Sequence, residues 1–322
     1  MTGVVTLSIE IELGWGMHDL GRYDHLSPRG ERERAFLSRL LDACEAFDVP
    51  VSFDVVGHLL LDSCGGSHEG PHPDGWFAAD PGTDVETDPL FYAPDAVGEI
   101  RRRPTDHELC THTFSHVVCN RVDAAVVDRD LALAQSYHRE RLGAPARTLV
   151  PPRHGPPPRE SLDRAGIEVV RLAESPSSPT PVHRFKHLLV GPHPDLPPRL
   201  RDGVVETYGT DYMSLTASSL PLGQQSTHPA FRPLPVSLRQ RLHERYLVRQ
   251  TERVAATDGY LHLWCHLWDL SNEYQWAPIR AYLRRLGRLR AEGRVDVLPM
   301  VDLGRHVRRV AVDGQIPNVP TY

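Results

Sequence analysis

The sequence of 322 residues predicts an α/β fold, a distorted (β/α) barrel of about seven parallel strands with long loop insertions. Three observations predict it: apolar, β-branched segments alternate with helical stripes about seven times, no linker or internal repeat divides the chain, and 40% of the residues are hydrophobic. Such alternation is typical of a parallel sheet, and this many units favours a barrel over an open sheet. We therefore expect a single domain over residues 1–322.

Each expected strand is a short run of alternating or continuous apolar residues. These runs occupy residues 4–13, 50–61 (ending in a turn), 107–112, 147–152, 167–172, 204–208, 260–268 and 294–301. The expected helices have apolar residues three and four positions apart. They occupy residues 29–48, 122–143, 157–166, 236–256 and 278–292. Two stretches rich in Pro, Gly, Asp and His, residues 62–95 and 173–202, are too irregular for either element, and we expect them to be insertions near the functional site.

Composition excludes several classes of function. The net charge of −6 and the pI near 6.3 argue against a nucleic-acid-binding protein, which usually carries a basic excess. No apolar run approaches the roughly 18 residues of a membrane span, so we expect no membrane association. The chain enters its first strand without a secretory signal, and its five cysteines form no Cys-x-x-Cys pair, so we expect a reduced, cytoplasmic protein. The oligomeric state stays open.

Acidic and histidine side chains gather at the predicted ends of strands. In SIEIELGWG, Glu10 and Glu12 are two residues apart on a strand and therefore point to the same face. Two acids on the inner face of an apolar strand are costly unless a cation compensates them, although on an edge strand they could simply face solvent. In HTFSH, His112 and His116 can close on one metal ion if the backbone turns there. A solvated pair is the alternative, because the chain has 18 histidines.

Two further signatures follow later in the chain. Arg153 stands just beyond the prolines that stop the strand at 147–152, and LHLWCHLWDL carries His262 and His266 among bulky residues. Carboxylates and two histidines with open positions are typical of a divalent metal site that keeps water or substrate as a ligand. A free carboxylate and a separate histidine can then act as base and acid. Together these groups favour hydrolysis of an amide or an ester.

These motifs resemble those of the polysaccharide deacetylases, also called the NodB-homology or carbohydrate esterase family 4 fold. HTFSH fits the family's His-Ser/Thr-x-x-His motif. SIEIELGWG resembles the family's first motif, in the branch in which this motif is Asp-x-Glu, and LHLWCHLWDL resembles the family's late motif. The resemblance covers roughly residues 4–300 and implies a distorted barrel with a divalent metal ion, for which zinc is expected.

The resemblance also implies a role for each candidate residue. Glu12, His112 and His116 would be the metal ligands, and Glu10 the catalytic base. Arg153 would orient that base, and His266 would protonate the leaving amine. Two departures stand out. The family's first acid is normally aspartate, one methylene shorter than Glu10, and VPPRHG lacks the family's usual Arg-x-Pro-x-Gly spacing.

We therefore expect a metal-dependent hydrolase that removes an acetyl group from an N-acetylated sugar or a sugar-like small metabolite. A non-sugar C–N hydrolase on the same barrel, acting on a cyclic amide or a formamide, is one alternative. A catalytically silent barrel that binds carbohydrate is another. A small substrate is expected because the insertions at 62–95 and 173–202 could cover the barrel mouth.

Overall fold

A computed structural model describes residues 2–173, 196–209, 215–227 and 229–312. One nine-stranded sheet forms its centre, and in the described part of the chain its strands pair in the order β6-β7-β5-β4-β3-β2-β1-β8, with β9 also pairing with β1. The strands are β1 Gly3–Ile11, β2 Ser52–Val55, β3 Glu108–Thr111, β4 Thr148–Leu149, β5 Val169–Ala173, β6 Arg199–Arg201, β7 Val204–Gly209, β8 Tyr260–His266 and β9 Val295–Val297. All strand pairs are parallel except that of β6 with β7.

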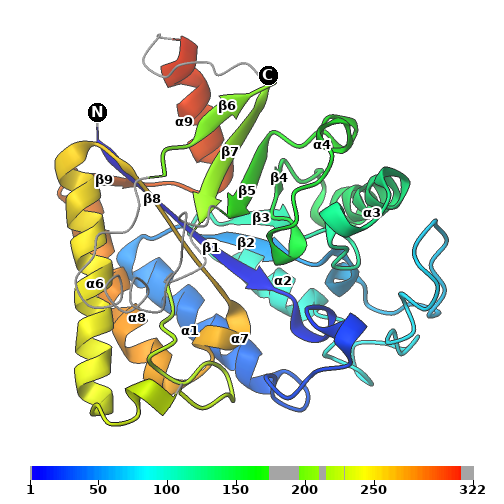
Figure 1. Cartoon of the computed structure of the whole chain (residues 1–322), viewed down its shortest axis with the longest axis horizontal. Coiled ribbons are helices and arrows are strands. Elements are labelled where there is room, and N and C mark those ends of the chain that lie inside the picture. The colour runs from blue at the N-terminus through cyan, green and yellow to red at the C-terminus, as the bar shows by residue number, and fades with distance from the viewer. Residues whose placement is uncertain (1, 174–195, 210–214, 228, 313–322) are drawn as a thin grey trace.

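Helices surround this sheet, with α6 and α8 on one side of the view in Figure 1 and α3 and α4 on the other. The α-helices are α1 Glu31–Phe47, α2 Pro94–Arg102, α3 Ala124–Tyr137, α4 Arg159–Ala165, α6 Val236–Thr257, α7 Leu267–Leu270, α8 Glu273–Ala291 and α9 Met300–Val312. Short 3-10 and π segments are η1 Leu13–Trp15, η2 His18–Leu20, η3 Gly57–Leu60, η4 Cys119–Arg121, η5 His138–Leu142, η6 Pro152–His154 and η7 Pro229–Phe231. Within the described ranges, no helix is long and apolar enough to cross a bilayer.

The sheet curls into a distorted barrel, which confirms the predicted fold class. Strands β7 and β8 face each other through side chains: Thr207 Oγ1 lies 3.0 Å from His262 Nδ1, and His262 Nε2 lies 2.9 Å from Ser8 Oγ on β1. A Cβ on Gly209 would come within 2.8 Å of the Trp264 ring, so the absence of a side chain there permits this approach. His262 therefore joins β1, β7 and β8 inside the barrel.

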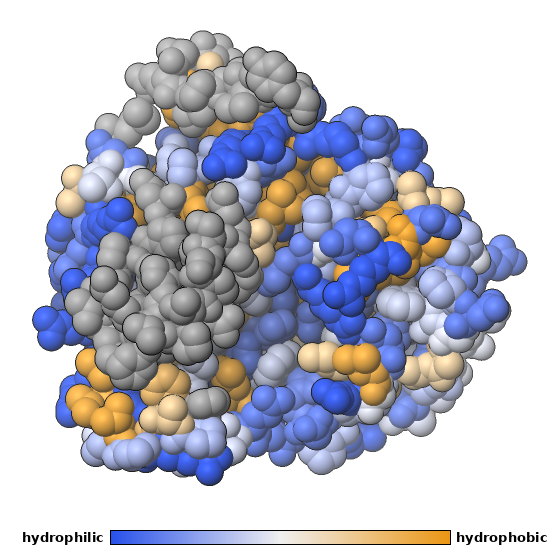
Figure 2. Space-filling model, viewed as in Figure 1, coloured by the Kyte–Doolittle hydropathy of each residue, from blue (hydrophilic) through white to orange (hydrophobic). Residues whose placement is uncertain are grey.

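Alternation along β1 separates two environments. Val5, Leu7, Ile9 and Ile11 pack into the main hydrophobic core together with residues of α1, α6 and α8. Thr6, Ser8 and Glu10 point to the opposite face of β1 and are also buried, but they have polar side chains. The barrel interior is consequently polar along β1, and this polar row leads to the carboxyl end of the strand. Figure 2 shows a mostly hydrophilic face there, with apolar residues in separate patches.

The predicted insertions differ in outcome. Residues 62–93 contain no helix or strand apart from an isolated bridge between Ser63 and Asp84, as expected. The second insertion lies mostly outside the described residues, but its end forms β6, which was predicted as irregular. Asp202 and Gly203, both with positive φ, form the tight turn from β6 into β7. Helices α2 and α9 were also not predicted. Backbone amides at the start of α9 donate to Ser52 and Glu108 side chains.

Candidate active site

The three predicted metal ligands meet beyond the carboxyl ends of β1 and β3. The Nε2 atoms of His112 and His116 lie 3.1 and 3.0 Å from the same oxygen, Glu12 Oε1. One ligand atom from each of the three residues lies within 4.8 Å of the others, and all three residues are buried. Side chains a hundred residues apart in sequence thus form one cluster.

Unusual backbone conformations position these side chains. Leu13, Thr113, His116, Arg153 and His154 all have φ between 44° and 61°, and all follow β1, β3 or β4. Positive φ is costly for a β-branched residue such as Thr113, and such strain concentrates at functional sites. On the β1 side, a Cβ on Gly16 would overlap Glu12 Oε2, so the glycine leaves room for the carboxylate. The turns after these strands aim the polar groups inward.

The chemistry of these donors fits a metal ion. His112 Nδ1 lies 2.7 Å from the carbonyl oxygen of Val150, which can only accept, so Nδ1 carries the proton. His112 Nε2 then faces a carboxylate oxygen, Glu12 Oε1, and a cation between the two atoms would be bound by both. His116 Nδ1 is buried and has no hydrogen-bond partner, and burial lowers the pKa of His116, which favours its neutral, ligating form. Glu12, His112 and His116 therefore match a divalent metal centre.

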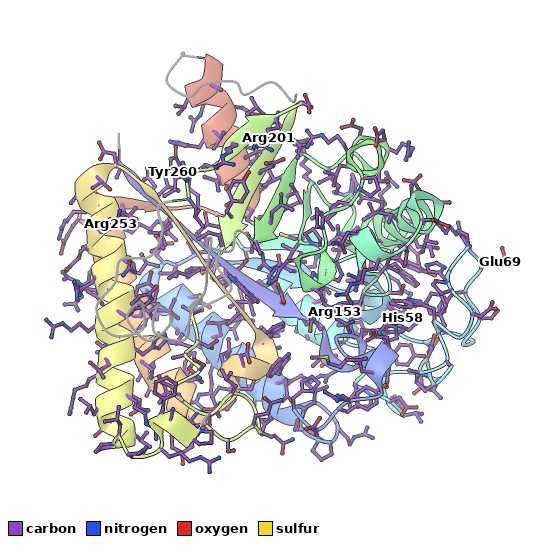
Figure 3. The ribbon with its side chains drawn as sticks, in the orientation of Figure 1. His58, Glu69, Arg153, Arg201, Arg253 and Tyr260 are labelled. Atoms are coloured by element: carbon purple, nitrogen blue, oxygen red, sulfur yellow. The ribbon has the colours of Figure 1, made fainter. Side chains whose placement is uncertain are left out.

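Glu10 lies beside this cluster, and the arginine that contacts it is not the predicted one. The Arg171 guanidinium on β5 pairs with Glu10 Oε1, and it also lies 2.9 Å from Ser8 Oγ. Arg153 instead forms an ion pair with Asp19 at the surface of the site, with an Nη1 to Oδ2 distance of 2.8 Å. Figure 3 labels Arg153 near the end of β1. The assignment of Arg153 as the residue that orients Glu10 is therefore not supported by the contacts.

Sequence reasoning missed Arg171, although a signal was present. It stands within the apolar run IEVVRL, and its side chain is fully buried. A buried charge is costly unless paired, so an arginine in a core strand indicates an acidic partner across the barrel. Its guanidinium also lies 4.7 Å from the Trp264 ring centroid, a cation–π contact that holds it in place.

His266 contacts both carboxylates at the end of β8. Its Nε2 lies 3.0 Å from Glu10 Oε2 and 3.9 Å from Glu12 Oε1. Its Nδ1 lies 2.8 Å from Asp269 Oδ2, and its ring stacks on Trp268 with centroids 4.9 Å apart. Asp269 was not predicted, though its position three residues after a strand-end histidine is where a helix-start carboxylate can reach back. The structure thus brings five of the six predicted site residues together and leaves Arg153 outside.

Electrostatics give the two central groups opposite charges. Burial alone would raise the pKa of Glu10, but Arg171 and His266 outweigh it and hold that pKa well below its usual range. Burial opposes protonation of His266, yet Glu10, Glu12 and Asp269 together raise its pKa well above the ordinary value. At neutral pH this leaves a carboxylate that can accept a proton next to an imidazolium that can donate one.

The insertion at residues 62–93 forms a wall beside the HTFSH loop. Trp76 Nε1 donates to Ser115 Oγ at 2.9 Å, and His72 Nε2 lies 3.0 Å from Asp130 Oδ2 on α3. On the side of β1, Gly14 donates its amide to the carbonyl of Leu90. The insertion therefore connects the loops that carry Glu12 and the two histidines to the rim of the molecule, where Glu69 is labelled in Figure 3.

Known proteins similar to this chain are found by comparison of structures but not by comparison of sequences. No family model and no curated protein matches the sequence. By structure, the chain is similar to a putative polysaccharide deacetylase from Mycobacterium smegmatis, with TM-score 0.61, 15% identity, and coverage of 100% of this chain and 94% of the other. It is also similar to a probable polysaccharide deacetylase from Pseudomonas aeruginosa PAO1, with TM-score 0.57, 12% identity, and coverage of 95% and 91%.

The similarity extends to a protein described as Puue Allantoinase, with TM-score 0.58, 11% identity, and coverage of 98% of this chain and 92% of the other. At these identities the similarity concerns the fold. The fold that the three motifs implied is confirmed: this chain has the fold of the polysaccharide deacetylases.

Proposed function

We propose that this protein is a metal-dependent hydrolase that removes the acetyl group from an N-acetylated sugar or sugar-like small metabolite. The observation that carries the proposal is the convergence of Glu12, His112 and His116 beside the Glu10–His266 ion pair. Three ligating side chains next to an ionised acid–base pair make up the set of groups that metal-assisted amide hydrolysis requires. The deacetylase fold of the similar structures agrees with it.

Each group has a distinct part in the reaction. Glu12, His112 and His116 would hold the metal, and a bound divalent ion supplies a Lewis acid that polarises the acyl carbonyl and acidifies water. Glu10 accepts a proton from the attacking water, and Arg171 holds its other oxygen in place. His266, oriented by Asp269, donates a proton to the nitrogen as the C–N bond breaks, which releases acetate and an amine.

Geometry indicates how substrate must enter. Glu10 Oε2 and His266 Nε2 contact each other at 3.0 Å, so water and the acyl group have to separate them before both can act. The acid has some access from outside, since the His266 side chain is 25% exposed, whereas that of Glu10 is 4% exposed. Substrate therefore approaches from the His266 side, over Trp268, whose ring stacks on the imidazole.

A small substrate is part of the proposal. The wall formed by residues 62–93 borders the site along the HTFSH loop, which limits how a long polymer could cross it. Hydrolysis of another C–N bond is the second candidate. Two observations favour it: the fold is shared with an allantoinase, and the base is Glu10 where the deacetylase motif normally has aspartate.

Acetate release from N-acetylated monosaccharides and from oligomers of increasing length tests the proposal. We expect zinc-dependent release that is greatest with the monomers, abolished by Glu10→Gln and unaffected by the matched surface change Glu31→Gln. Activity that rises with chain length would contradict the small-substrate part. Ring opening of cyclic amides, or formate release from formamides, without acetate release would support the second candidate. No hydrolysis by the zinc-loaded protein would refute both.

A further inference from the structure

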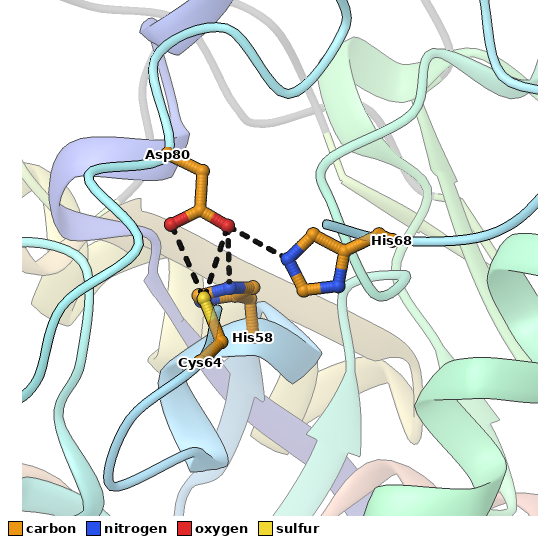
Figure 4. Close-up of side chains that lie close together, drawn as sticks. All are labelled: His58, Cys64, His68 and Asp80. Atoms are coloured by element: carbon orange, nitrogen blue, oxygen red, sulfur yellow. Dashed lines mark hydrogen bonds and ion pairs between the residues drawn. The ribbon is translucent and has the colours of Figure 1, made fainter. Parts of the chain in front are cut away.

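A second group of metal-ligating side chains lies outside the site described above. Cys64, His68 and Asp80 belong to the insertion at residues 62–93, and His58 stands on η3 just before it. One ligand atom from each of the four lies within 4.8 Å of the others. Figure 4 shows His58, Cys64 and His68 arranged around the Asp80 carboxylate. We call these four residues the insertion cluster.

The distances match the size of a metal site. Asp80 Oδ2 lies 3.2 Å from His58 Nε2, 2.7 Å from His68 Nε2 and 3.2 Å from Cys64 Sγ. Tetrahedral zinc with bonds of about 2.0–2.3 Å keeps its ligand atoms roughly 3.3–3.8 Å apart. The three contacts of Asp80 would have to lengthen by less than about 1 Å, and the other ligand atoms, which lie within 4.8 Å of one another, would have to close by at most about 1.5 Å. Changes of this size are within the reach of side-chain rotation.

His58 carries the argument that the cluster is more than a hydrogen-bond network. Its side chain has no solvent exposure, and its Nδ1 lies 3.1 Å from the carbonyl oxygen of Phe91, so Nδ1 holds the proton that this contact requires. Its Nε2 faces Asp80 Oδ2 at 3.2 Å without the geometry of a hydrogen bond. A histidine that bonds a backbone carbonyl through one nitrogen and turns the other toward an anionic ligand atom has the usual arrangement of a metal ligand.

Local backbone geometry brings Cys64 and Asp80 together. Gly66 and Gly82 each follow one of them by two residues, and both have positive φ, 70° and 62°. A Cβ on either glycine would come within 3.2 Å of the other glycine's Cα. The absence of side chains at Gly66 and Gly82 therefore lets the two segments of the loop lie against each other. The Gly66 amide donates to Cys64 Sγ at 3.3 Å, and the Gly82 amide donates to Asp80 Oδ1 at 3.0 Å. Both bonds orient ligand atoms inward.

Aromatic rings enclose the insertion cluster. Trp15 and Tyr92 lie 4.4 and 5.3 Å from the His58 ring, and Phe77 lies 4.6 Å from the His68 ring. Such a shell limits solvent access and strengthens the interaction of a cation with its ligands. The insertion cluster shares no residue with Glu12, His112 and His116, although Trp15 stands only three residues after Glu12.

We propose that His58, Cys64, His68 and Asp80 form a second, structural zinc site that fastens the insertion to the barrel. Two nitrogens, one sulfur and one carboxylate oxygen are a zinc ligand set, and four protein ligands close the tetrahedron, which is characteristic of structural rather than catalytic sites. Zinc would displace the thiol proton of Cys64. Since the insertion also bonds Ser115 through Trp76, the ion would hold one wall of the candidate active site in position.

Metal content and a thiolate-specific spectrum test the proposal on the full-length protein. We expect the parent to retain two zinc ions after dialysis against a weak chelator, and Cys64→Ser or His68→Gln to retain one. His72→Gln is the matched control, because it changes a histidine of the same insertion that contacts Asp130 instead of the cluster. His116→Ala should also lose one ion, but the other one, so the double variant with Cys64→Ser should lose both.

Cobalt substitution separates the two sites and needs no variant to fold well. Only the insertion cluster contains sulfur, so cobalt there should give a thiolate-to-cobalt charge-transfer band in the near ultraviolet. The band should persist in His116→Ala, even if that variant is inactive, and disappear in Cys64→Ser. Chelation should also make Cys64 more reactive toward a thiol reagent, because removal of the metal frees its sulfur. The other four cysteines are buried, so the added reactivity can be assigned to Cys64. A parent protein without this band under saturating cobalt, or with equal zinc content in Cys64→Ser, would overturn the proposal.

Discussion

Replacing Arg171 by methionine should damage this protein far more than replacing Arg153 by methionine. Arg171 is fully buried and pairs with Glu10, whose side chain is only 4% exposed. Methionine keeps much of the packing against Trp264 but leaves the Glu10 carboxylate buried without its cation. Removing one partner of a buried ion pair costs about 3–5 kcal/mol of unfolding free energy. The Arg153–Asp19 pair is partly exposed, so its loss should cost about 0–1 kcal/mol.

A second acid near Arg171, Asp54, does not reduce the expected loss of stability in Arg171→Met. Asp54 Oδ2 lies 3.5 Å from Arg171, but burial raises the pKa of Asp54 well above its usual range, which favours its neutral form. The charge of Arg171 therefore balances Glu10. Adding Glu10→Gln to Arg171→Met should recover part of the lost stability, because the unpaired charge disappears, and the coupling in this double-mutant cycle should be about 1–3 kcal/mol.

Urea denaturation at pH 7, followed by circular dichroism, measures these differences, and turnover measured on the folded fraction gives the catalytic effect. A base displaced by about 1 Å can lose two orders of magnitude in rate, so Arg171→Met should lower turnover by about a hundredfold. Arg153→Met should stay within a few-fold of the parent. Equal losses of stability and turnover in the two single variants, or no coupling in the cycle, would refute the assignment of Arg171 as the residue that positions Glu10.

Four further predictions concern other parts of the molecule. His112→Ala should remove the metal next to Glu12, as measured by metal analysis, whereas metal that stays fully bound would contradict its role as a ligand. His266→Ala should keep that metal but lower turnover by about a hundredfold. In contrast, His262→Ala should lower the urea midpoint with little change in turnover, because His262 bonds Ser8 and Thr207 inside the barrel. Burial lowers the pKa of His138 to about 4, so its unfolded form binds a proton more readily and stability falls as pH drops below about 6.5. His138→Leu should remove about 2 kcal/mol of that loss at pH 5, and an unchanged pH dependence of unfolding would contradict this.

The fold was largely predictable because its signals are local. Alternating residues in β1 and helical stripes in α1, α6 and α8 reflect the face that each element buries, and these appear in short windows of sequence. Strand β6 was missed although Asp202-Gly203 is a strong turn signal, because three residues leave almost no pattern on their own. Helix α9 was missed because its first turn is stabilised by side chains from β2 and β3, distant in sequence.

The candidate site was predictable only where one strand end carries its own motif. Glu12, His112, His116 and His266 each stand in a recognisable segment, and parallel strands necessarily bring their carboxyl ends together. Arg153 follows a strand end and is therefore expected at the site, whereas Arg171 reaches Glu10 from the middle of β5 across the barrel. No local sequence pattern indicates which side chains meet in the barrel interior. The insertion cluster was hidden for the same reason: His58 and Asp80 become neighbours only when the loop between them folds back.

The pairing of Glu10 with Arg171 and of Arg153 with Asp19 follows from where these side chains stand in the barrel. Glu10 stands in register with Asp54 on β2 and with His266 on β8, so three ionisable side chains form a row across adjacent strands. A glutamate extends one methylene further from β1 into the barrel interior than an aspartate would. A cation that meets its carboxylate there must come from the facing wall, and β5 supplies Arg171 at that position, fixed by Ser8 and Trp264. An arginine at the strand-end position of Arg153 is then free to pair with Asp19 at the edge of the site. The carboxylate of Glu10 is therefore paired inside the barrel, whereas the arginine of VPPRHG is paired with Asp19 at the edge of the site.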